Sequence, residues 1–435
     1  MEKIFKQVKG VYRNLSGDFK SALTNILWLF GDKILKVVSE ILVGGWVAQY
    51  LGAEDFGLLN YAIAYAIIFN AISKFGITNI LVRELVEKPN KKNDALGSAF
   101  VIRFFTTLFC ICCFLILSYS IHQNDKTTFL ILVIISLSLI GSLFETIDAF
   151  YQAMVKSKYM VLSKNIVLFS FIVIKVILIL AEQPLEYFAL AYSLEIIGFG
   201  LCMLLLYNQK YESLINWKFD FVMAKSLVRD SWPLMVSSLF ISIYMRVDQI
   251  MLLYMSSEKE VGIYSAAIRI SEAWNFIPVI ICASFFPYIL KEKKNESSYQ
   301  NTLKRLYLIM IGASSVVIVV IWILADFIIG FLFGMEYIDS SLISRIHILG
   351  APFGFLGVAT SQYLVSENLT KVSLYRTLIG VIMNLILNYF LIPAYGGVGA
   401  AIATVFSYAS VVLALTLFKD ARGQIKIIFK AITFS

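Results

Sequence analysis

The sequence predicts an all-α integral membrane protein with about twelve transmembrane helices in two six-helix lobes around a central cavity. Composition is the first reason. Of 435 residues, 59% are hydrophobic and 15% are charged, whereas soluble domains carry about 25% charged residues. The number of long apolar stretches and an internal repeat are the other two reasons.

Apolar stretches of about 20 residues, the length that crosses a bilayer core, recur along the whole chain. Six are predicted in the first half, over residues 22–50, 57–82, 96–119, 128–154, 160–181 and 184–208. Six more are predicted in the second half, over residues 231–255, 262–290, 306–333, 341–366, 372–393 and 397–418. The first stretch is too long for a removable signal peptide, so we expect the basic N-terminal segment to be retained.

The connections between these stretches alternate in charge. RELVEKPNKKND (83–94) and LKEKKNESSYQNTLKR (290–305) are strongly basic, whereas short connections such as LGAEDF and PAYGGV carry no Lys or Arg. Among the connections on the side opposite to the basic ones, the only basic residues are Lys126 and Lys259. Because Lys and Arg accumulate in cytoplasmic loops, this alternation predicts that both termini are cytoplasmic.

An internal repeat divides the chain. YLGAEDFGLLNYA at 50–62 matches YMSSEKEVGIYSAA at 254–267 when one inserted residue is allowed. Both copies follow the first long span of their half and have the same orientation. The repeat predicts a lobe over residues 1–208 and a lobe over residues 231–435, joined by a basic cytoplasmic linker at 209–230 and related by an axis along the membrane normal.

Several kinds of chemistry are excluded by missing motifs. No G-x-x-x-x-G-K-[ST] segment occurs, so the chain has no P-loop for ATP. His122 and His347 are isolated from each other and from the five cysteines, so we expect no metal site and no cofactor. The basic residues are scattered between apolar spans, which does not indicate a nucleic-acid partner. The outward loops are short, so we expect no enzyme with catalytic groups in an external loop.

Charged residues inside the spans are the main candidates for function. A basic side chain at a helix centre costs about 2.5–3.5 kcal/mol on insertion scales, so these residues are expected to face the interior or to be paired. The basic ones are Lys33, Lys36, Lys74, Arg103, Lys175, Arg246, Arg269 and Arg345. The acids available for pairing are Asp32, Glu40, Glu145, Asp148, Glu195, Asp248, Glu272 and Asp326.

The first span carries Lys33, Lys36 and Glu40 within about 60° on one helix face. One interpretation is that both lysines form a cationic site in the membrane for an anionic group. The alternative is an intrahelical ladder in which Asp32, Lys36 and Glu40 pair at i, i+4 spacing. We favour the binding site because the ladder leaves Lys33 without a partner.

The stretch ISIYMRVDQIMLLYM (241–255) places Arg246 and Asp248 about 200° apart on one helix, so they cannot pair with each other. The turn to the next span is short, so the two helices are antiparallel neighbours. Asp248 lies about as many residues before this turn as Arg269 lies after it. Arg246 and Glu272 match in the same way. We therefore predict contacts of Asp248 with Arg269 and of Arg246 with Glu272. None of these charges is repeated in the other lobe, which favours a role in recognising a phosphate-bearing ligand.

The same region resembles a known family. YMRVDQIMLLYMSSEKEVGIYSAAIRISEAW (244–274) is similar to the seventh and eighth helices of Wzx-type O-antigen flippases. These form part of the polysaccharide-transport branch of the multidrug/oligosaccharidyl-lipid/polysaccharide exporter (MOP) superfamily. VAQYLGAEDFGLLNYA (47–62) and MNLILNYFLIPAYGGVGAAIATVFSY (383–408) resemble it at corresponding places. One departure is Gln49, where family members often have Arg. The resemblance covers essentially the whole chain.

The resemblance implies a flippase that moves an undecaprenyl-pyrophosphate-linked oligosaccharide, an O-antigen or similar repeat unit, from the cytoplasmic to the periplasmic leaflet of a bacterial inner membrane. Expected partners are this glycan, membrane lipids and the glycan polymerase machinery. The candidate substrate-binding residues are Lys33, Lys36, Arg246 and Arg269. The candidate residues for ion coupling or a charge network are Glu40, Asp248 and Glu272.

Three other functions remain as alternatives. A drug/cation antiporter of the same superfamily would have the same fold and would also use acidic residues in the membrane, although the lysines in the spans argue against a cationic substrate. A polymerase or ligase acting on the lipid-linked glycan would need a large outward catalytic loop. A scaffold that does not transport is the third alternative.

Overall fold

The computed structural model describes residues 17–293, 295–367 and 369–433, without the side chains of 17–30, 32, 157, 287, 290 and 370. All regular secondary structure in these ranges is helical, which confirms the predicted all-α class. The chain forms two compact units. Of the described residues, the first contains those up to Ser39 and Phe69–Met235, and the second contains Glu40–Ile68 and those from Val236 onward.

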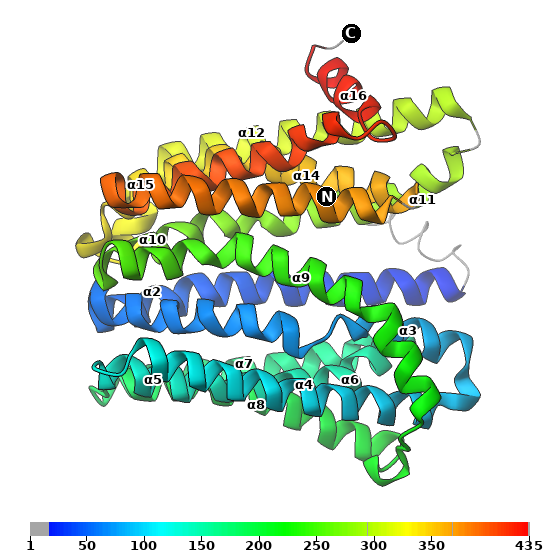
Figure 1. The fold of residues 1–435 in the computed structure, drawn as a ribbon, viewed down its shortest axis with the longest axis horizontal. Helices are drawn as coiled ribbons and strands as arrows, with labels where there is room; N and C mark the ends of the chain where they lie inside the picture. The colour runs from blue at the N-terminus through cyan, green and yellow to red at the C-terminus, as the bar shows by residue number, and fades with distance from the viewer. Residues whose placement is uncertain (1–16, 294, 368, 434–435) are drawn as a thin grey trace, which may run out of the picture. The chain divides into compact units, whose positions relative to one another are not determined.

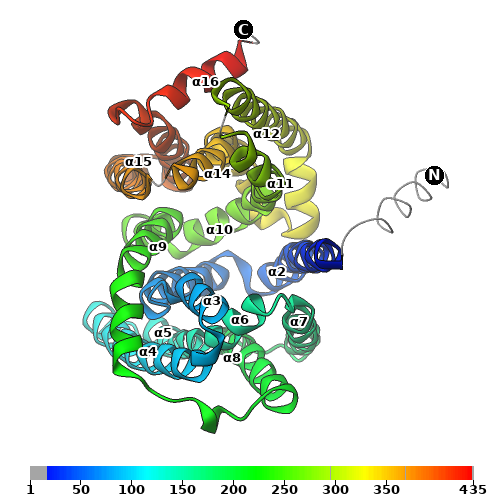
Figure 2. The same ribbon diagram turned by 90° about the vertical axis from the view of Figure 1, so that its right-hand side faces the viewer.

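The first unit is a bundle built around α6 and α8. α6 packs on α3, α4 and α8, and α8 packs on α5 and α7. The bundle is seen end-on in Figure 2. Its buried core includes Leu81, Phe150 and Tyr207. The helices of the bundle are α3 (Ile77–Glu87), α4 (Lys92–Ile121), α5 (Lys126–Ser136), α6 (Gly141–Ala153), α7 (Ser157–Leu180) and α8 (Leu185–Lys210).

Residues 211–220 lie in the segment predicted to link the lobes and are hydrogen-bonded to the first residues of α4. The Lys218 amide donates to the Asn93 carbonyl at 3.1 Å, and the Ser98 hydroxyl donates to the Asp220 carbonyl at 3.1 Å. Glu212 accepts from Lys92 at 2.8 Å and also from Asn93. These two bonds lower the pKa of Glu212 below its usual range. The segment is therefore held against the bundle by hydrogen bonds at both of its ends.

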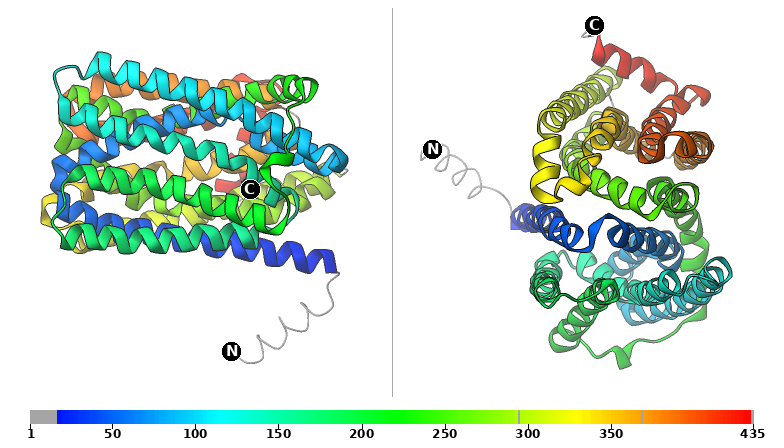
Figure 3. Two further views of the ribbon diagram at one scale, coloured as in Figure 1. Left: turned by 90° about the horizontal axis from the view of Figure 1, so that it is seen from below. Right: turned by 90° about the vertical axis from the view of Figure 1, so that its left-hand side faces the viewer.

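The second unit centres on α14, which packs on α11, α12 and α15, while α13 packs on α10, α12 and α15. Its core includes Leu306, Tyr307 and Phe355. Its long helices run roughly parallel (Figure 1) and appear end-on in the right half of Figure 3. The helices are the part of α9 (Phe221–Met255) that follows Met235, α10 (Glu258–Glu272), α11 (Phe276–Glu292), α12 (Glu296–Leu332), α13 (Ser340–His347), α14 (Ala351–Ser366), α15 (Thr370–Leu413) and α16 (Gly423–Ile432).

Two helices, α2 (Gly17–Ser73) and α15, are interrupted by a glycine. Gly52 has φ 74° and Gly396 has φ 54°, a left-handed conformation that glycine adopts at low cost. A glutamate bonds the backbone next to each break. Glu336 accepts from the Ala53 amide at 2.9 Å, and Glu260 accepts from the Gly397 amide at 2.7 Å. Both carboxylates satisfy amides that the interrupted helix leaves without an intrahelical partner.

Ten helical stretches in the described part of the chain are long and apolar enough to cross a membrane. Two of them, Lys33–Glu87 with 55 residues and Lys371–Leu417 with 47, contain the breaks described above. At 1.5 Å per residue each is more than twice as long as one crossing requires. Each break also lies between two of the spans predicted from sequence. The structure supports a multi-pass membrane protein, while the count of twelve crossings stays a prediction.

The two copies of the sequence repeat pack against each other within the second unit. The contact is made by the glycine that both copies share. A Cβ added at Gly57 would lie 1.9 Å from the Glu258 carbonyl oxygen, and one added at Gly262 would lie 2.0 Å from the Ala53 carbonyl oxygen. The hydroxyl groups of Tyr61 and Tyr254 bond at 2.7 Å beside this crossing. Backbone thus packs directly on backbone.

We expect Gly57→Ala to lower the stability of the protein by about 1–3 kcal/mol, the usual cost of overpacking, because the new methyl group must displace a backbone carbonyl. The thermal midpoint of the detergent-purified protein measures this. Gly312→Ala is the matched control, since a Cβ at this position of α12 meets no atom within 4 Å. Equal midpoints for the two variants would contradict the close crossing.

Candidate functional site

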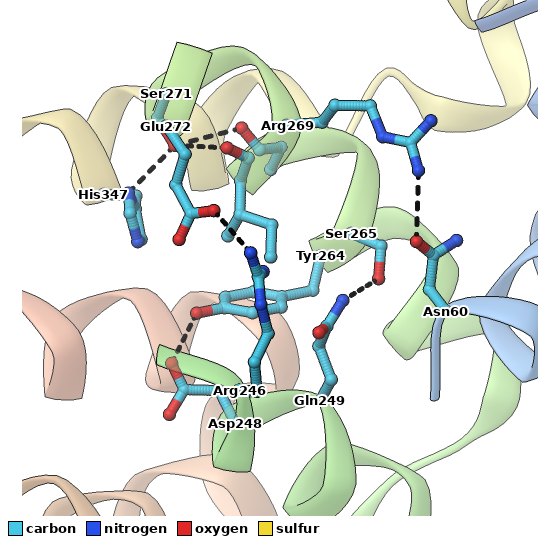
Figure 4. A network of polar contacts seen from close by, with 12 residues as sticks. Asn60, Arg246, Asp248, Gln249, Tyr264, Ser265, Arg269, Ser271, Glu272 and His347 are labelled. Atoms are coloured by element: carbon cyan, nitrogen blue, oxygen red, sulfur yellow. Dashed lines mark hydrogen bonds and ion pairs between the residues drawn. The ribbon is translucent and has the colours of Figure 1, made fainter. Parts of the chain in front are cut away.

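A network of polar side chains occupies the membrane-spanning helices of the second unit (Figure 4). Arg246 of α9 donates to Glu272, the last residue of α10, at 3.1 Å. The two side chains are only 22% and 15% exposed, so the ion pair is largely shielded from the surroundings of the protein. The predicted contact between Arg246 and Glu272 is confirmed.

Asp248 lies almost completely buried on another face of α9, with 2% of its surface exposed. Its Oδ2 atom accepts from the Tyr264 hydroxyl at 2.6 Å and from the Thr404 hydroxyl at 2.7 Å. Its Oδ1 atom accepts from the Asn388 amide at 2.6 Å. All three donors are neutral groups. The predicted contact between Asp248 and Arg269 is therefore wrong.

Arg269 points away from Asp248 and toward Asn60 (Figure 4). Its guanidinium donates to the Asn60 side-chain oxygen at 3.2 Å and to the Glu40 carbonyl at 3.3 Å, and it lies 5.1 Å from the centre of the Phe56 ring. Tyr264, which does contact Asp248, precedes Arg269 by five residues and so lies about 140° around α10. Gln249, next to Asp248, likewise bonds Ser265, so this part of α9 lies opposite residues 264–265 of α10 and not opposite Arg269.

The oxygen atoms around Asp248 form a chemically distinct set. Asn388 also donates to the Asn384 side-chain oxygen at 3.1 Å, and the Asn388 side-chain oxygen is itself buried with no hydrogen-bond donor in the described structure. Carboxylate, amide and hydroxyl oxygens are the ligands that hard cations prefer. The set around Asp248 and Asn388 could therefore bind such a cation. Among the described residues, no group of three or more His, Cys, Asp and Glu could hold a metal ion.

Helix α15 supplies most of this set, and the sequence prediction omitted its residues. Asn384 and Asn388 precede the break at Gly396, and Thr404 follows it. The available signal was the pair of amides four residues apart within the apolar run MNLILNYF, because this spacing puts both on one helix face.

Arg376, also in α15, was omitted too. It is 3% exposed and donates to the Thr360 and Ser361 hydroxyl groups, both at 2.6 Å. It lies inside the predicted span 372–393 but is absent from the basic residues named there. The neighbouring helix α14 instead surrounds its guanidinium with hydroxyl and carbonyl oxygens, including that of Gly357 at 3.1 Å.

The first unit contains a separate polar cluster beside the break between α2 and α3. Lys74 pairs with Glu145 at 2.6 Å. Arg103 is fully buried and donates to the hydroxyl groups of Thr78 at 2.8 Å and Thr146 at 3.1 Å. The pairing expected for charges in the spans is confirmed for Lys74, and for the pairs Lys175–Glu195 and Arg345–Asp326.

The predicted lysine site lies on α2, where Lys33, Lys36 and Glu40 are all exposed. The side chain of Asp32, the first member of the alternative ladder, lies outside the described residues. Both lysines belong to the first unit, whereas Arg246 and Arg269 belong to the second. That these four cations bind one ligand stays a prediction.

The long apolar helices with polar groups buried between them define a multi-pass membrane protein. The comparison of sequences then gives the family. The chain belongs to the family described as "Polysaccharide biosynthesis protein", whose model matches residues 22–293. A second model, MatE, matches residues 233–390.

Two curated relatives are similar to the chain. The "Probable low-salt glycan biosynthesis flippase Agl15" of Haloferax volcanii is 27% identical over 237 residues, which cover 53% of this chain and 49% of Agl15. The chain thus spans about half the length of that relative. The "Capsular polysaccharide biosynthesis protein CapF" of Staphylococcus aureus is 24% identical over 389 residues, 88% of this chain and 95% of CapF.

Solved structures share the fold. An inward-facing multidrug resistance MATE family transporter of the MOP superfamily superposes with a TM-score of 0.71 at 16% identity, covering 90% of this chain and 95% of the other. The lipid II flippase MurJ, in an inward closed conformation, superposes with a TM-score of 0.69 at 19% identity, covering 94% and 91%. The predicted resemblance to the polysaccharide-transport branch of this superfamily is confirmed.

The Arg246–Glu272 pair can be tested with a double-mutant cycle. We expect Arg246→Gln or Glu272→Gln alone to lower stability by about 3–5 kcal/mol, because each leaves a shielded charge without its partner. The double variant should be more stable than the sum of the two effects implies. Thermal midpoints in detergent measure the coupling, and additive effects would contradict the pair.

The same measurement distinguishes the observed partners of Asp248 from the predicted one. Arg269→Gln should not rescue any loss of stability in Asp248→Asn, because the two side chains share no hydrogen bond. We expect the two effects to add within about 0.5 kcal/mol. Thr404→Val is the positive control, since it removes a direct donor and should show coupling to Asp248→Asn.

Proposed function

We propose that this protein is a flippase that translocates an undecaprenyl-pyrophosphate-linked oligosaccharide, an O-antigen or similar repeat unit, from the cytoplasmic to the periplasmic leaflet. Membership of the polysaccharide biosynthesis family over residues 22–293 carries the proposal. The description of the relative Agl15 as a glycan biosynthesis flippase supports it. The protein would lie in a bacterial inner membrane, with both termini cytoplasmic, and deliver the glycan to polymerase machinery.

The head group is the part of this substrate that must be carried across. A pyrophosphate is stabilised by charge-assisted hydrogen bonds, and Arg binds it through two parallel N–H groups. We assign this role to Lys33, Lys36, Arg246 and Arg269. The polyprenyl tail would stay in lipid while two lobes, residues 1–208 and 231–435, alternately open to the two sides.

Arg246 and Arg269 would have to exchange partners to bind the substrate. Arg246 is paired with Glu272, and Arg269 donates to the Asn60 side chain and to a backbone carbonyl. A pyrophosphate offers more acceptor oxygens and more charge than these partners. Binding would therefore release Glu272, which connects substrate binding to the position of α10.

Asp248 is the strongest of the three candidate acids for ion coupling. Glu272 is neutralised by Arg246, whereas the hydrogen bonds of Asp248 come from Tyr264, Asn388 and Thr404, all neutral. A carboxylate in such a buried place is stabilised when it binds a proton or a sodium ion. Glu40 is the third candidate. It lies next to Arg269, which donates to the Glu40 backbone carbonyl.

Complementation tests the function directly. The gene, expressed in a flippase-null strain that makes defined lipid-linked oligosaccharides, should restore surface glycan for at least one repeat unit. Surface glycan is read with a glycan-specific antibody or lectin, and membrane fractions are checked for the protein. Absence of surface glycan for every oligosaccharide, with the protein present in the membrane, would overturn the proposal.

Lys36→Gln tests the cationic site. We expect this variant to reach the membrane at the normal level but to restore little or no surface glycan, because the pyrophosphate loses a charged partner. Lys371→Gln is the matched control, since Lys371 is likewise an exposed helical lysine but lies outside the proposed site. Full glycan export by the Lys36 variant would remove Lys36 from the site.

A drug/cation antiporter is the second candidate function. The MatE model that matches residues 233–390 and the superposition on MATE transporters favour it. The lysines on α2 argue against a cationic substrate. Unchanged drug susceptibility in a deletion strain, together with loss of surface glycan, would favour the flippase; the reverse result would favour the antiporter.

A further inference from the structure

The last described helix, α16, has one face packed on its own unit. Gln424, Ile425, Ile428 and Ala431 are buried, and α16 packs against α12. The Tyr307 hydroxyl of α12 donates to the Gln424 side-chain oxygen at 2.6 Å inside this contact. The contact fixes the rotation of α16 about its axis and so determines which of its side chains point outward.

The opposite face is basic and carries one large aromatic ring. Arg422, just before the helix, and Lys426, Phe429 and Lys430 are exposed, and Phe429 has 58% of its surface uncovered. At 100° per residue these four positions lie within about 100° of each other. A phenylalanine surrounded by cations is the pattern of helices that lie at the boundary between lipid headgroups and acyl chains.

The orientation of α16 agrees with this pattern. In Figure 2, where α12 and most of α15 are viewed nearly along their axes, α16 (red) is seen from the side. It therefore runs across the direction of the membrane-spanning helices. The apolar stretch Lys371–Leu417 ends shortly before Gly423, so α16 begins close to the membrane surface.

A cavity of about 360 Å³ lies beside this face, between α16 and the ends of α12 and α14. Lys426 and Lys430 line its α16 wall, while Glu296, Tyr363 and Glu367 line the other side. Glu367 is already engaged, since Lys293 lies 3.3 Å from it and the Tyr299 hydroxyl donates to it at 2.8 Å. Glu296 accepts from the neutral Gln300 side chain, so the side of the cavity suited to an anion is the one lined by Lys426 and Lys430.

We propose that α16 is a lipid-binding helix whose outer face docks on anionic phospholipid headgroups, with a headgroup phosphate held by Lys426 and Lys430. The ring of Phe429 enters the acyl boundary, and Arg422 contributes a further charge at the start of the helix. Negative headgroups attract a cluster of Lys and Arg next to a transmembrane helix, and this attraction weakens as salt screens it. The lipid contact is independent of which glycan is transported.

Hydrogen exchange on the full-length protein tests the proposal. The protein is reconstituted into nanodiscs of phosphatidylcholine alone or of phosphatidylcholine with phosphatidylglycerol. We expect amide exchange over residues 423–432 to be several-fold slower with phosphatidylglycerol, and high salt to remove most of the difference. The triple variant Arg422→Gln, Lys426→Gln, Lys430→Gln should lose the difference.

The matched control is Lys291→Gln, Arg305→Gln, Lys371→Gln, which removes the same charge from exposed positions outside α16 and should keep the difference. Equal exchange of the unmodified protein in both lipids would overturn the proposal. Inorganic phosphate that slows exchange in phosphatidylcholine alone to the same extent would overturn the assignment to lipid. The loss of the difference in both triple variants would show that net charge, and not α16, is responsible.

Discussion

An uncompensated charge in the hydrocarbon core is costly, and the buried charges of this chain are arranged around that cost. The pair of Arg246 with Glu272 is the clearest case, because it joins α9 to the end of α10. Asp248 has no cation bonded to it, and its carboxylate is instead stabilised by hydrogen bonds from three neutral donors. The helices of the second unit are positioned by these bonds as well as by apolar packing.

This arrangement divides the polar residues into two kinds. Pairs such as Lys175–Glu195 balance charge locally, between α7 and α8, and leave little for a substrate to use. Asp248 and Arg376 instead have only neutral partners among the described residues, so a charge remains within the protein. Such residual charges are suited to function, because an ion or a substrate can neutralise them and thereby favour one conformation.

The helices and one contact of the polar network could be predicted from the sequence, whereas most partners of Asp248 could not, for a geometric reason. The helices follow from apolar length, and the Arg246–Glu272 contact follows from equal depth on two helices joined by a short turn. Two of the three partners of Asp248 do not, because Asn388 and Thr404 are 140 and 156 residues away on α15. Depth along a helix can be counted in the sequence, but the direction in which a side chain faces depends on helices that are distant in the chain.

The crossing of the repeat copies at Gly57 and Gly262 has a consequence for motion. Since each glycine lies on a backbone carbonyl of the other copy, no side chains interlock at the closest point. The two segments can therefore separate and return at this point without a rotamer change. A methyl group added at either glycine would keep them from meeting. The close backbone packing therefore defines a single closed position. Opening it at the centre does not require any side chain to move out of the way.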